Sequence, residues 1–400
     1  MSCFSAEEYA GRLARVRAAM AEHGLAALIV LGPENINYLS GLDYQGFFAL
    51  TALVLPVAGT PLLVTRAMEH PTVAAQATGC AHLPYTDVEE PADVLIRAVR
   101  QVTGTAERVA VERGQMTLPP QVWDAAQAGL GDRDVCDGTG IVDAARHDRS
   151  PAEVECSRAA AVASSAAMEA GIATVAEGVS EREIAAEVYR AMLLAGSDYP
   201  GFVPLVRSRD RLLQEHVTFG DQRLQDGDAL FLELSGCVAR YHAPLTRMVY
   251  VGSAPPGTAR AAEISLAGLE AVRQAMLPGV GAAKVYEAWQ QVIDEGLGHD
   301  RYRRHHCGYL VGLGFPPSWV GGGRVVGLRP GNELVLREGM TFHVLSWLLG
   351  QDPADYVVSD TILVTPHGGE ILTTAPREPI IVAPSAERVS SSVRHSELSH

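Results

Sequence analysis

Ionisable side chains gather in one apolar stretch of the chain, residues 231–250, where two hydrophobic runs flank a polar turn. This pattern predicts a β-hairpin. One acid, one imidazole and two guanidinium groups fall inside it, namely Glu233, His242, Arg240 and Arg247. Such groups are costly to bury unless they are paired. The stretch therefore favours an active-site wall with acid–base chemistry, and the alternative is a structural network of paired charges.

The length, composition and net charge of the chain limit the class of protein. The chain has 400 residues, of which 47% are hydrophobic and 20% are charged, and its formal net charge is −15. A chain of this length is expected to form two globular domains. An acidic chain without a basic run argues against nucleic acid and anionic membranes as main partners.

Targeting signals and metal-binding cysteine pairs are not expected. No apolar run reaches the roughly 18 residues of a transmembrane helix. The first residues lack the basic region and apolar core of a signal peptide, so a cytoplasmic location is expected. The six cysteines form no CxxC pair, which favours free thiols over zinc or redox chemistry.

Residues 1–149 are expected to form an α/β domain. Ser5 and Glu8 form a capping box at the start of a helix, and further helical stretches are expected near 67–78 and 90–102. A polar loop is expected at 35–41, where α/β proteins often place ligand contacts; an ordinary turn is the alternative. The expected strands are 27–31, 49–56, 61–65 and 109–111.

Residues 150–384 are expected to form an α+β domain with a mixed, largely antiparallel sheet. Ser150, Pro151 and Glu153 mark the start of its first helix. Residues 385–400 are expected to be a disordered tail. The expected helices are 151–176, 181–196, 257–276 and 281–296. The expected strands are the hairpin at 229–252 and the segments 308–314, 340–349, 360–365 and 369–374.

The order of elements and three motifs resemble the creatinase, prolidase and methionine aminopeptidase superfamily. The motifs are residues 232–247, 308–317 and 339–343. The resemblance covers nearly the whole chain and implies a creatinase-like N-terminal domain followed by a pita-bread catalytic domain. Within this superfamily the closest likeness is to ectoine hydrolases.

The resemblance also implies how this chain differs from its metal-dependent relatives. Those enzymes hold two metal ions with two aspartates, one histidine and two glutamates. The likeness places these positions at Glu233, Pro244, Tyr309, Leu345 and Ser359. Proline and leucine offer no side-chain ligand, and tyrosine and serine are poor substitutes for imidazole and carboxylate. The chain thus resembles a metal-free member, as creatinase is, and no metal or other cofactor is expected.

Two residues are predicted to be catalytic. His216 matches the histidine that creatinase uses as a proton shuttle, and imidazole titrates near neutral pH. Glu233 is the one remaining carboxylate of the metal positions and is predicted to act as a nucleophile, a base or a partner for a cationic nitrogen. The alternatives are a core histidine and a salt bridge from Glu233 to Arg240 or Arg247.

The substrate pocket is expected to differ from that of ectoine hydrolases. The Asp-Trp-Gly-Glu segment usual in those enzymes is replaced at 318–321, residues 344–349 are unbroken and apolar, and an expected glutamate is missing from 356–360. The loss of carboxylates predicts a more apolar pocket. The residues predicted to bind substrate are Tyr241, His242, Arg247, Tyr309, His343 and Asp360.

These residues together favour a metal-independent hydrolase of a C–N bond in a small cyclic amidine or guanidino amino acid, similar to ectoine or creatine. One alternative is a non-hydrolytic elimination, cyclisation or isomerisation in a biosynthetic pathway, and another is a non-catalytic binding protein. The resemblance further implies a head-to-tail homodimer, in which residues such as Asn35, Tyr44 and Phe47 could reach the partner's site.

Overall fold

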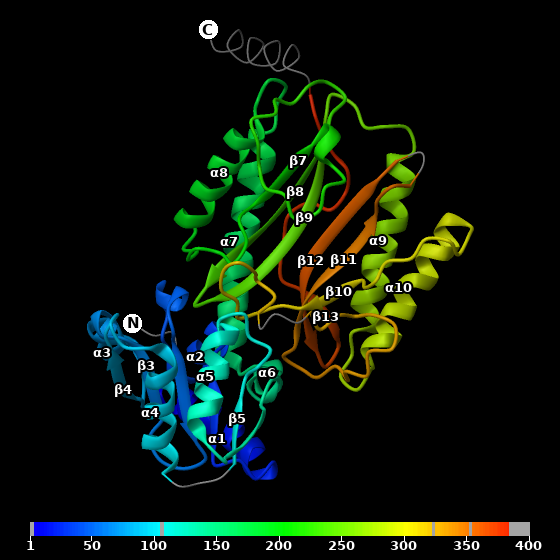
Figure 1. The fold of residues 1–400 in the computed structure, drawn as a ribbon. Coiled ribbons are helices and arrows are strands. Elements are labelled where there is room, and N and C mark those ends of the chain that lie inside the picture. Colours follow the sequence, from blue (N-terminus) through cyan, green and yellow to red (C-terminus); the bar gives the residue numbers. More distant parts are fainter. Residues whose placement is uncertain (1–3, 105–107, 322–324, 352–353, 384–400) are drawn as a thin grey trace. The chain divides into compact units, whose positions relative to one another are not determined.

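The computed structural model describes residues 4–104, 108–321, 325–351 and 354–383. The expected disordered tail therefore lies outside the described residues. The chain divides into two compact units, and the division falls between Asp148 and Arg149 (Figure 1). Within the described ranges, no helix is both long enough and apolar enough to cross a membrane.

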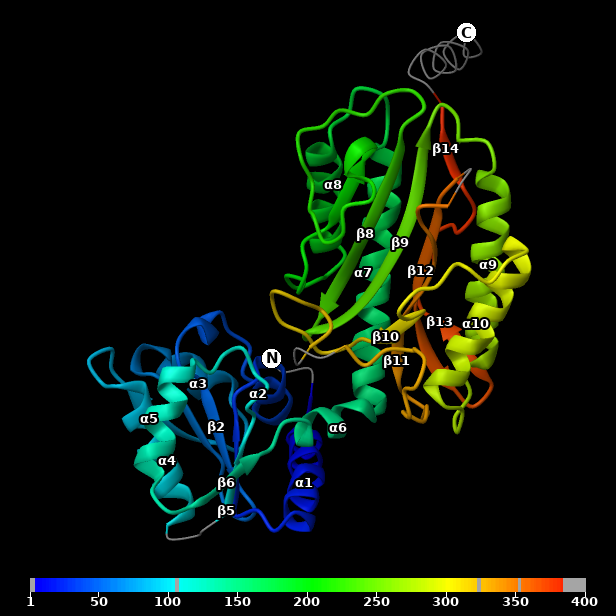
Figure 2. The same cartoon turned by 45° about the vertical axis from the view of Figure 1, so that its right-hand side comes forward.

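The N-terminal unit contains a mixed sheet whose described strands run in the order β4-β3-β2-β1-β5-β6. The central strand β1 is buried along its whole length, as expected when helices cover both faces. Helices α4 and α5 lie on one side of the sheet and α1 on the other (Figure 2). The predicted α/β architecture is confirmed. The strands are β1 (Ala27–Val30), β2 (Ala52–Pro56), β3 (Leu62–Arg66), β4 (Ala81–Tyr85), β5 (Arg108–Val111) and β6 (Asp134–Asp137). The α-helices are α1 (Ala6–Glu22), α2 (Pro33–Ser40), α3 (His70–Gln76), α4 (Pro91–Thr103), α5 (Pro120–Leu130) and α6 (Ile141–His147).

The prediction of a polar loop at 35–41 is wrong, because residues 35–40 belong to helix α2. Pro33 occupies the first helical turn, where its missing N–H costs nothing, and Gly41 ends the helix with a left-handed φ of 82°. Asn35 is buried in this helix and donates to the Glu112 carboxylate at 2.6 Å. Asn35 therefore forms a buried hydrogen bond within the N-terminal unit.

The C-terminal unit is built on a sheet whose described strands run in the order β10-β11-β12-β9-β8-β7, with β13 on β12 and β14 on β9. Among the described strands of this sheet, all pairings are antiparallel except that of β14 with β9, so the predicted α+β class is confirmed. The strands are β7 (Leu205–Ser208), β8 (Ala229–Val238), β9 (Tyr241–Val251), β10 (Gly308–Leu310), β11 (Thr341–Leu348), β12 (Tyr356–Thr365), β13 (Gly368–Ile371) and β14 (Ile380–Val382). The α-helices are α7 (Pro151–Thr174), α8 (Glu181–Leu194), α9 (Thr258–Ala275) and α10 (Ala282–Leu297).

Side chains alternate along each strand between a face of this sheet that the helices cover and an opposite face that carries polar groups. Leu232 and Leu234 of β8 join the core formed with α7 and α8, and Ser346 of β11 accepts a hydrogen bond from Trp289 of α10 at 3.0 Å. Successive side chains in a strand point to opposite faces. Glu233 and His343 therefore lie on the face opposite the helices, whose arrangement beside the strands is drawn in Figures 1 and 2.

Helix α7 packs tightly against the hairpin of β8 and β9 because Gly236 has no side chain. A Cβ atom there would lie 2.5 Å from the carbonyl oxygen of Ala160. The hydroxyl of Ser164 accepts from Gly236 N–H and donates to Ala243 O, both at 2.6 Å. The helix is thereby joined to both strands of the hairpin.

The hairpin turns at two residues that are not glycine yet have positive φ, Ala239 at 50° and Arg240 at 70°. A two-residue turn that matches the twist of the strands requires this conformation. Asp198 holds the turn, because its carboxylate accepts from Ala239 N–H at 2.9 Å and lies 3.7 Å from the Arg240 guanidinium.

We expect Ala239→Gly to raise the free energy of unfolding by about 0.5–1 kcal/mol, because glycine adopts this φ without a steric penalty. Ala267→Gly, at an exposed position of α9, is the matched control and should lower it by about 1 kcal/mol. Urea denaturation of both variants and the parent protein measures the two effects. A decrease for Ala239→Gly would contradict a strained turn.

Candidate active site

A pocket with about 550 Å³ of empty space, part of it open to solvent, lies on the polar face of the C-terminal unit's sheet. Its wall combines titratable and aromatic groups. The carboxylates and guanidinium groups are those of Glu215, Glu233, Arg207 and Arg304. The imidazoles are those of His216, His305 and His306, and the aromatic side chains are Phe202, Tyr309, Trp319 and Trp347.

One polar side chain from each of five neighbouring strands joins a hydrogen-bonded row across this face. In the strand order β10, β11, β12, β9 and β8, its members are Tyr309, His343, Ser359, Thr246 and Glu233. The Tyr309 hydroxyl lies 2.8 Å from His343 Nδ1, and His343 Nε2 lies 2.6 Å from Ser359 Oγ. Ser359 Oγ lies 2.7 Å from Thr246 Oγ1, and the Thr246 side chain hydrogen-bonds Glu233. We call these five residues the polar row.

The hydrogen bonds of the polar row run in one direction. Ser359 donates its proton to Thr246, so Ser359 accepts from His343 Nε2–H. Burial holds the pKa of His343 well below its usual value, so its neutral ring leaves Nδ1 to accept from Tyr309. The Tyr309 oxygen in turn accepts from the indole N–H of Trp319 at 3.0 Å. The row therefore begins at an indole donor and ends at the carboxylate of β8.

The carboxyl group at the end of the row titrates near neutral pH. Burial raises the pKa of Glu233 to about 7, while the charge of Arg207 and the hydrogen bond with Thr246 act in the opposite direction. Its Oε1 lies 3.9 Å from His343 Nε2, but a neutral imidazole carries no charge for an ion pair. Glu233 can therefore hold or release a proton at physiological pH.

His216, the other residue predicted to be catalytic, lines the same pocket as Glu233. It is exposed, and its ring stacks on Phe202 with centroids 6.0 Å apart. Its φ of 51° is uncommon for a residue other than glycine. An exposed imidazole that faces a pocket can exchange protons with water, and this pocket is also lined by the buried carboxyl group of Glu233.

Tyr241 and His242, both predicted to bind substrate, do not line this pocket. The Tyr241 hydroxyl donates to Glu153 of helix α7. His242 accepts from Gly201 N–H at 2.8 Å through Nε2, and its Nδ1 lies 3.2 Å from Gly312 O. Burial lowers the pKa of His242 to about 3, so both ring nitrogens are used by neutral hydrogen bonds.

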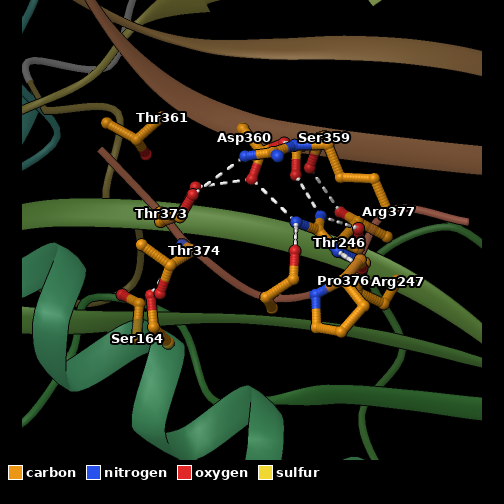
Figure 3. Close-up of polar contacts among 12 residues, drawn as sticks. Ser164, Thr246, Arg247, Ser359, Asp360, Thr361, Thr373, Thr374, Pro376 and Arg377 are labelled. Carbon is orange, nitrogen blue, oxygen red and sulfur yellow. Dashed lines mark hydrogen bonds and ion pairs between the residues drawn. The ribbon is translucent and has the colours of Figure 1, made fainter. Parts of the chain in front are cut away.

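Arg247 and Asp360, also predicted to bind substrate, form a buried network beneath the polar row (Figure 3). Asp360 accepts from Arg247 Nη2 at 2.9 Å and from Arg377 Nε at 2.6 Å. Arg247 Nη1 donates to the backbone carbonyls of Thr246 and Ser359, each at 2.7 Å. This guanidinium fixes the backbone of two members of the row and is a positioning residue for the site.

The five positions that the family resemblance assigns to metal ligands fall on five neighbouring strands and on the pocket face. They are Glu233, Pro244, Tyr309, Leu345 and Ser359. Among their side chains only Glu233 supplies a carboxylate. This carboxylate, the Tyr309 phenol and the Ser359 hydroxyl already form hydrogen bonds within the polar row. In the ranges that the structure describes, no three His, Cys, Asp or Glu residues are grouped closely enough to hold a metal ion. These residues do not fit a two-metal centre.

Sequence reasoning missed a set of cationic and donor groups in the pocket, chiefly Arg207, Arg304 and His306. Arg207 lies on β7 with the side-chain direction of Glu233, because Leu205 pairs with Glu233 in the sheet. A signal existed for the others, since residues 301–306 contain five basic side chains in an acidic protein. Arg207 offered no local signal, because its position depends on pairing across the sheet.

Comparison with known proteins gives the same fold. The model of metallopeptidase family M24 matches residues 155–366, and the model of the creatinase/prolidase N-terminal domain matches residues 12–147. The chain is 30% identical to the ectoine hydrolase of Halomonas elongata over 394 residues, which cover 94% of this chain and 97% of that protein. It is 29% identical to a probable dipeptidase PepE of Mycobacterium tuberculosis over 387 residues, which cover 95% and 98%.

Solved structures agree with these matches. The dipeptidase PepE from Mycobacterium ulcerans aligns with a TM-score of 0.80 at 26% identity, covering 95% of this chain and 99% of that one. The Xaa-Pro dipeptidase from Bacillus anthracis aligns with a TM-score of 0.81 at 20% identity, covering 94% and 100%. The predicted creatinase-like N-terminal domain and pita-bread C-terminal domain are confirmed.

We expect Ser359→Ala to lower the free energy of unfolding by about 1–3 kcal/mol, because it leaves the buried Nε2–H of His343 without an acceptor. Ser253→Ala, at an exposed serine, is the control and should change it by less than about 0.5 kcal/mol. Urea denaturation measures both, and ¹⁵N NMR of labelled histidine reports the ring proton of His343. A proton on Nδ1 in the parent protein would contradict the direction of the row.

Proposed function

Because this chain belongs to metallopeptidase family M24, with a creatinase/prolidase N-terminal domain and hydrolases among its relatives, we propose that it hydrolyses a C–N bond without a metal ion. The proposed substrate is a small cyclic amidine or guanidino amino acid, similar to ectoine or creatine. The 30% identity to an ectoine hydrolase supports this class.

The observation that carries the proposal is the polar row, three of whose members stand at positions that the resemblance assigns to metal ligands. A metal pair activates water and polarises the scissile group. In this chain a proline, a leucine, a phenol and a hydroxyl stand at four of the five positions. Dipeptidase activity, which the PepE relatives suggest, would require ligands that this donor set lacks. Hydrolysis must then use a proton shuttle and a charged partner for the substrate.

In the proposed mechanism Glu233 binds the cationic nitrogen of the substrate. An amidinium or guanidinium beside this carboxyl group favours its ionised form, and the pair keeps the substrate carbon electrophilic. The Thr246 hydroxyl, fixed by the rest of the polar row, orients the carboxylate. The pocket provides no other buried carboxylate for this role, since Glu215 is exposed.

His216 moves the proton. Neutral imidazole takes a proton from water as the water oxygen attacks the amidine carbon, and a tetrahedral carbon forms. The imidazolium then returns the proton to the leaving nitrogen, and the C–N bond breaks. Phe202 supports the His216 ring by stacking, so this group is held at the pocket while it remains open to solvent.

A second candidate is a non-hydrolytic step, such as an elimination, cyclisation or isomerisation, that uses the same proton shuttle. It is favoured by the changed segment at 318–321 and by the apolar strand 344–349, where this chain departs from the ectoine hydrolase pattern. Mass spectrometry of products formed in ¹⁸O-labelled water separates the two. Label in the product identifies hydrolysis, and its absence identifies the second candidate.

We also propose the head-to-tail homodimer implied by the family likeness. Tyr44 is buried and its hydroxyl bonds Thr51, and Phe47 packs edge-on against Tyr44 at 4.7 Å. Phe48, at 81% exposure, is the aromatic side chain of this segment most open to a partner. Light scattering of the purified protein tests the dimer.

We expect the protein to hydrolyse ectoine or creatine at an undiminished rate in EDTA. His216→Asn should lower kcat by roughly 10²–10⁴-fold, because it removes the proton shuttle. His367→Asn is the control, since His367 is an exposed histidine outside the pocket. Loss of turnover in EDTA that added zinc or manganese restores would contradict the metal-free reaction.

We expect kcat/KM to fall tenfold per pH unit below about 7, because the ionised form of Glu233 binds the cation and its pKa is raised to about 7. Glu233→Gln should abolish turnover. Thr246→Val removes a hydrogen bond that stabilises the anion, so the inflection should move to higher pH. An inflection that stays in place in Thr246→Val, or activity lost as pH rises through 7, would contradict this role.

A further inference from the structure

Four residues of the pocket wall each have one buried hydrogen-bonding atom without a partner among the described residues. Arg207 Nε, Arg304 Nε, Trp347 Nε1 and His306 Nδ1 are all buried. Within the described ranges none of these four atoms has a hydrogen-bond partner. All four residues line the pocket that also contains Glu233. We call these four residues the donor wall.

Aromatic rings hold the two guanidinium groups of the donor wall. The Arg207 guanidinium lies 3.8 Å from the centroid of the Phe231 ring, and the Arg304 guanidinium lies 4.8 Å from that of Trp347. The two rings meet edge to face at 5.6 Å. Cation–π stacking orients a guanidinium without using its N–H groups. The Nε–H of each cation is left without a partner, while the Arg304 side chain also hydrogen-bonds Tyr302.

No carboxylate neutralises these two cations at close range. Among the ion pairs of the described residues, none includes Arg207 or Arg304. Arg207 is only 1% exposed, and burial lowers its pKa, although the charge of Glu233 acts in the opposite direction. A buried guanidinium without a paired anion is costly, so this wall is suited to receive an anion from outside the chain.

The chemistry of the wall defines that anion. Guanidinium and indole groups only donate hydrogen bonds, so Arg207, Arg304 and Trp347 require acceptor oxygens. A carboxylate offers two oxygens, each with two lone pairs, and pairs with guanidinium through charge-assisted bonds. The carboxylates of Glu215 and Glu233 in the same pocket disfavour an anion of higher charge, such as phosphate.

We propose that the donor wall is a subsite for the carboxylate of the substrate. The substrate is then a zwitterion, with its carboxylate at Arg207 and Arg304 and its cationic nitrogen at Glu233. The placement of the cationic nitrogen at Glu233 rests on the proposed function, whereas the carboxylate subsite does not. With both groups in one pocket, the site suits a small molecule that carries a carboxylate and a cationic nitrogen.

The first test compares ectoine with its carboxamide, which has nearly the same shape but no negative charge. Calorimetry should show that the carboxamide binds the parent protein about tenfold to a hundredfold more weakly, the range for a hydrogen-bonded charge. Arg207→Gln and Arg304→Gln should remove most of this difference, and Arg207→Lys should restore part of it. Arg182→Gln, which removes an exposed ion pair with Asp221, is the control and should retain the difference in affinity between ectoine and its carboxamide.

The second test needs no assumption about the cationic end. Acetate should raise the Tm of the parent protein more than acetamide does at equal ionic strength, and the difference should vanish in Arg304→Gln. Because Arg304 is only partly buried, this variant remains informative if Arg207→Gln fails to fold. Equal shifts with acetate and acetamide would overturn the subsite.

The outcomes separate the subsite from the proposed reaction. Turnover of ectoine with equal affinity for its carboxamide would retain the reaction and overturn the subsite. Stabilisation by acetate that Arg304→Gln abolishes, without turnover of any amidine or guanidino acid, would retain the subsite and overturn the reaction.

Discussion

The polar row depends on a geometric property of a β-sheet, namely that side chains of neighbouring strands at the same level share one face. Five strands each place one polar group there, and four hydrogen bonds join them from Tyr309 to Glu233. Three members of the row, Glu233, Tyr309 and Ser359, stand at positions that the family resemblance assigns to metal ligands. In this chain these three side chains are joined by hydrogen bonds through His343 and Thr246.

The row also explains why Glu233 tolerates burial. A carboxyl group away from water ionises with difficulty, and its pKa rises to about 7. The Thr246 hydroxyl favours the anion, and it is oriented because Ser359 donates to its oxygen. Beneath these two residues, Arg247 binds both of their backbone carbonyls and is neutralised by Asp360. A structural network of charges thus supports a functional one on the other side of the same strands.

The pocket combines two kinds of binding group. Glu233 offers an acceptor, and the Nε–H groups of Arg207 and Arg304 have no hydrogen-bond partner among the described residues. A pocket with both groups suits a small molecule that carries both charges. The ring of Trp347 supports Arg304 and contributes an N–H of its own, so aromatic side chains in this pocket order the cations as well as filling space.

Alternation, capping residues and long motifs are local signals, and they were sufficient to predict the class of each unit, the hairpin at 229–252 and the family likeness. The sequence also identified Glu233 and His216, which line one pocket. The partners of the other polar residues depend on contacts between distant segments, which the sequence did not reveal. Thr246 and Ser359 are 113 residues apart in the chain and meet through strand pairing. Alternation along a strand predicts which of its residues share a face, but it does not predict which residues of other strands contact them. That is why Arg247 and His242 lie in satisfied networks, whereas Arg207, with no local signal, reaches the pocket.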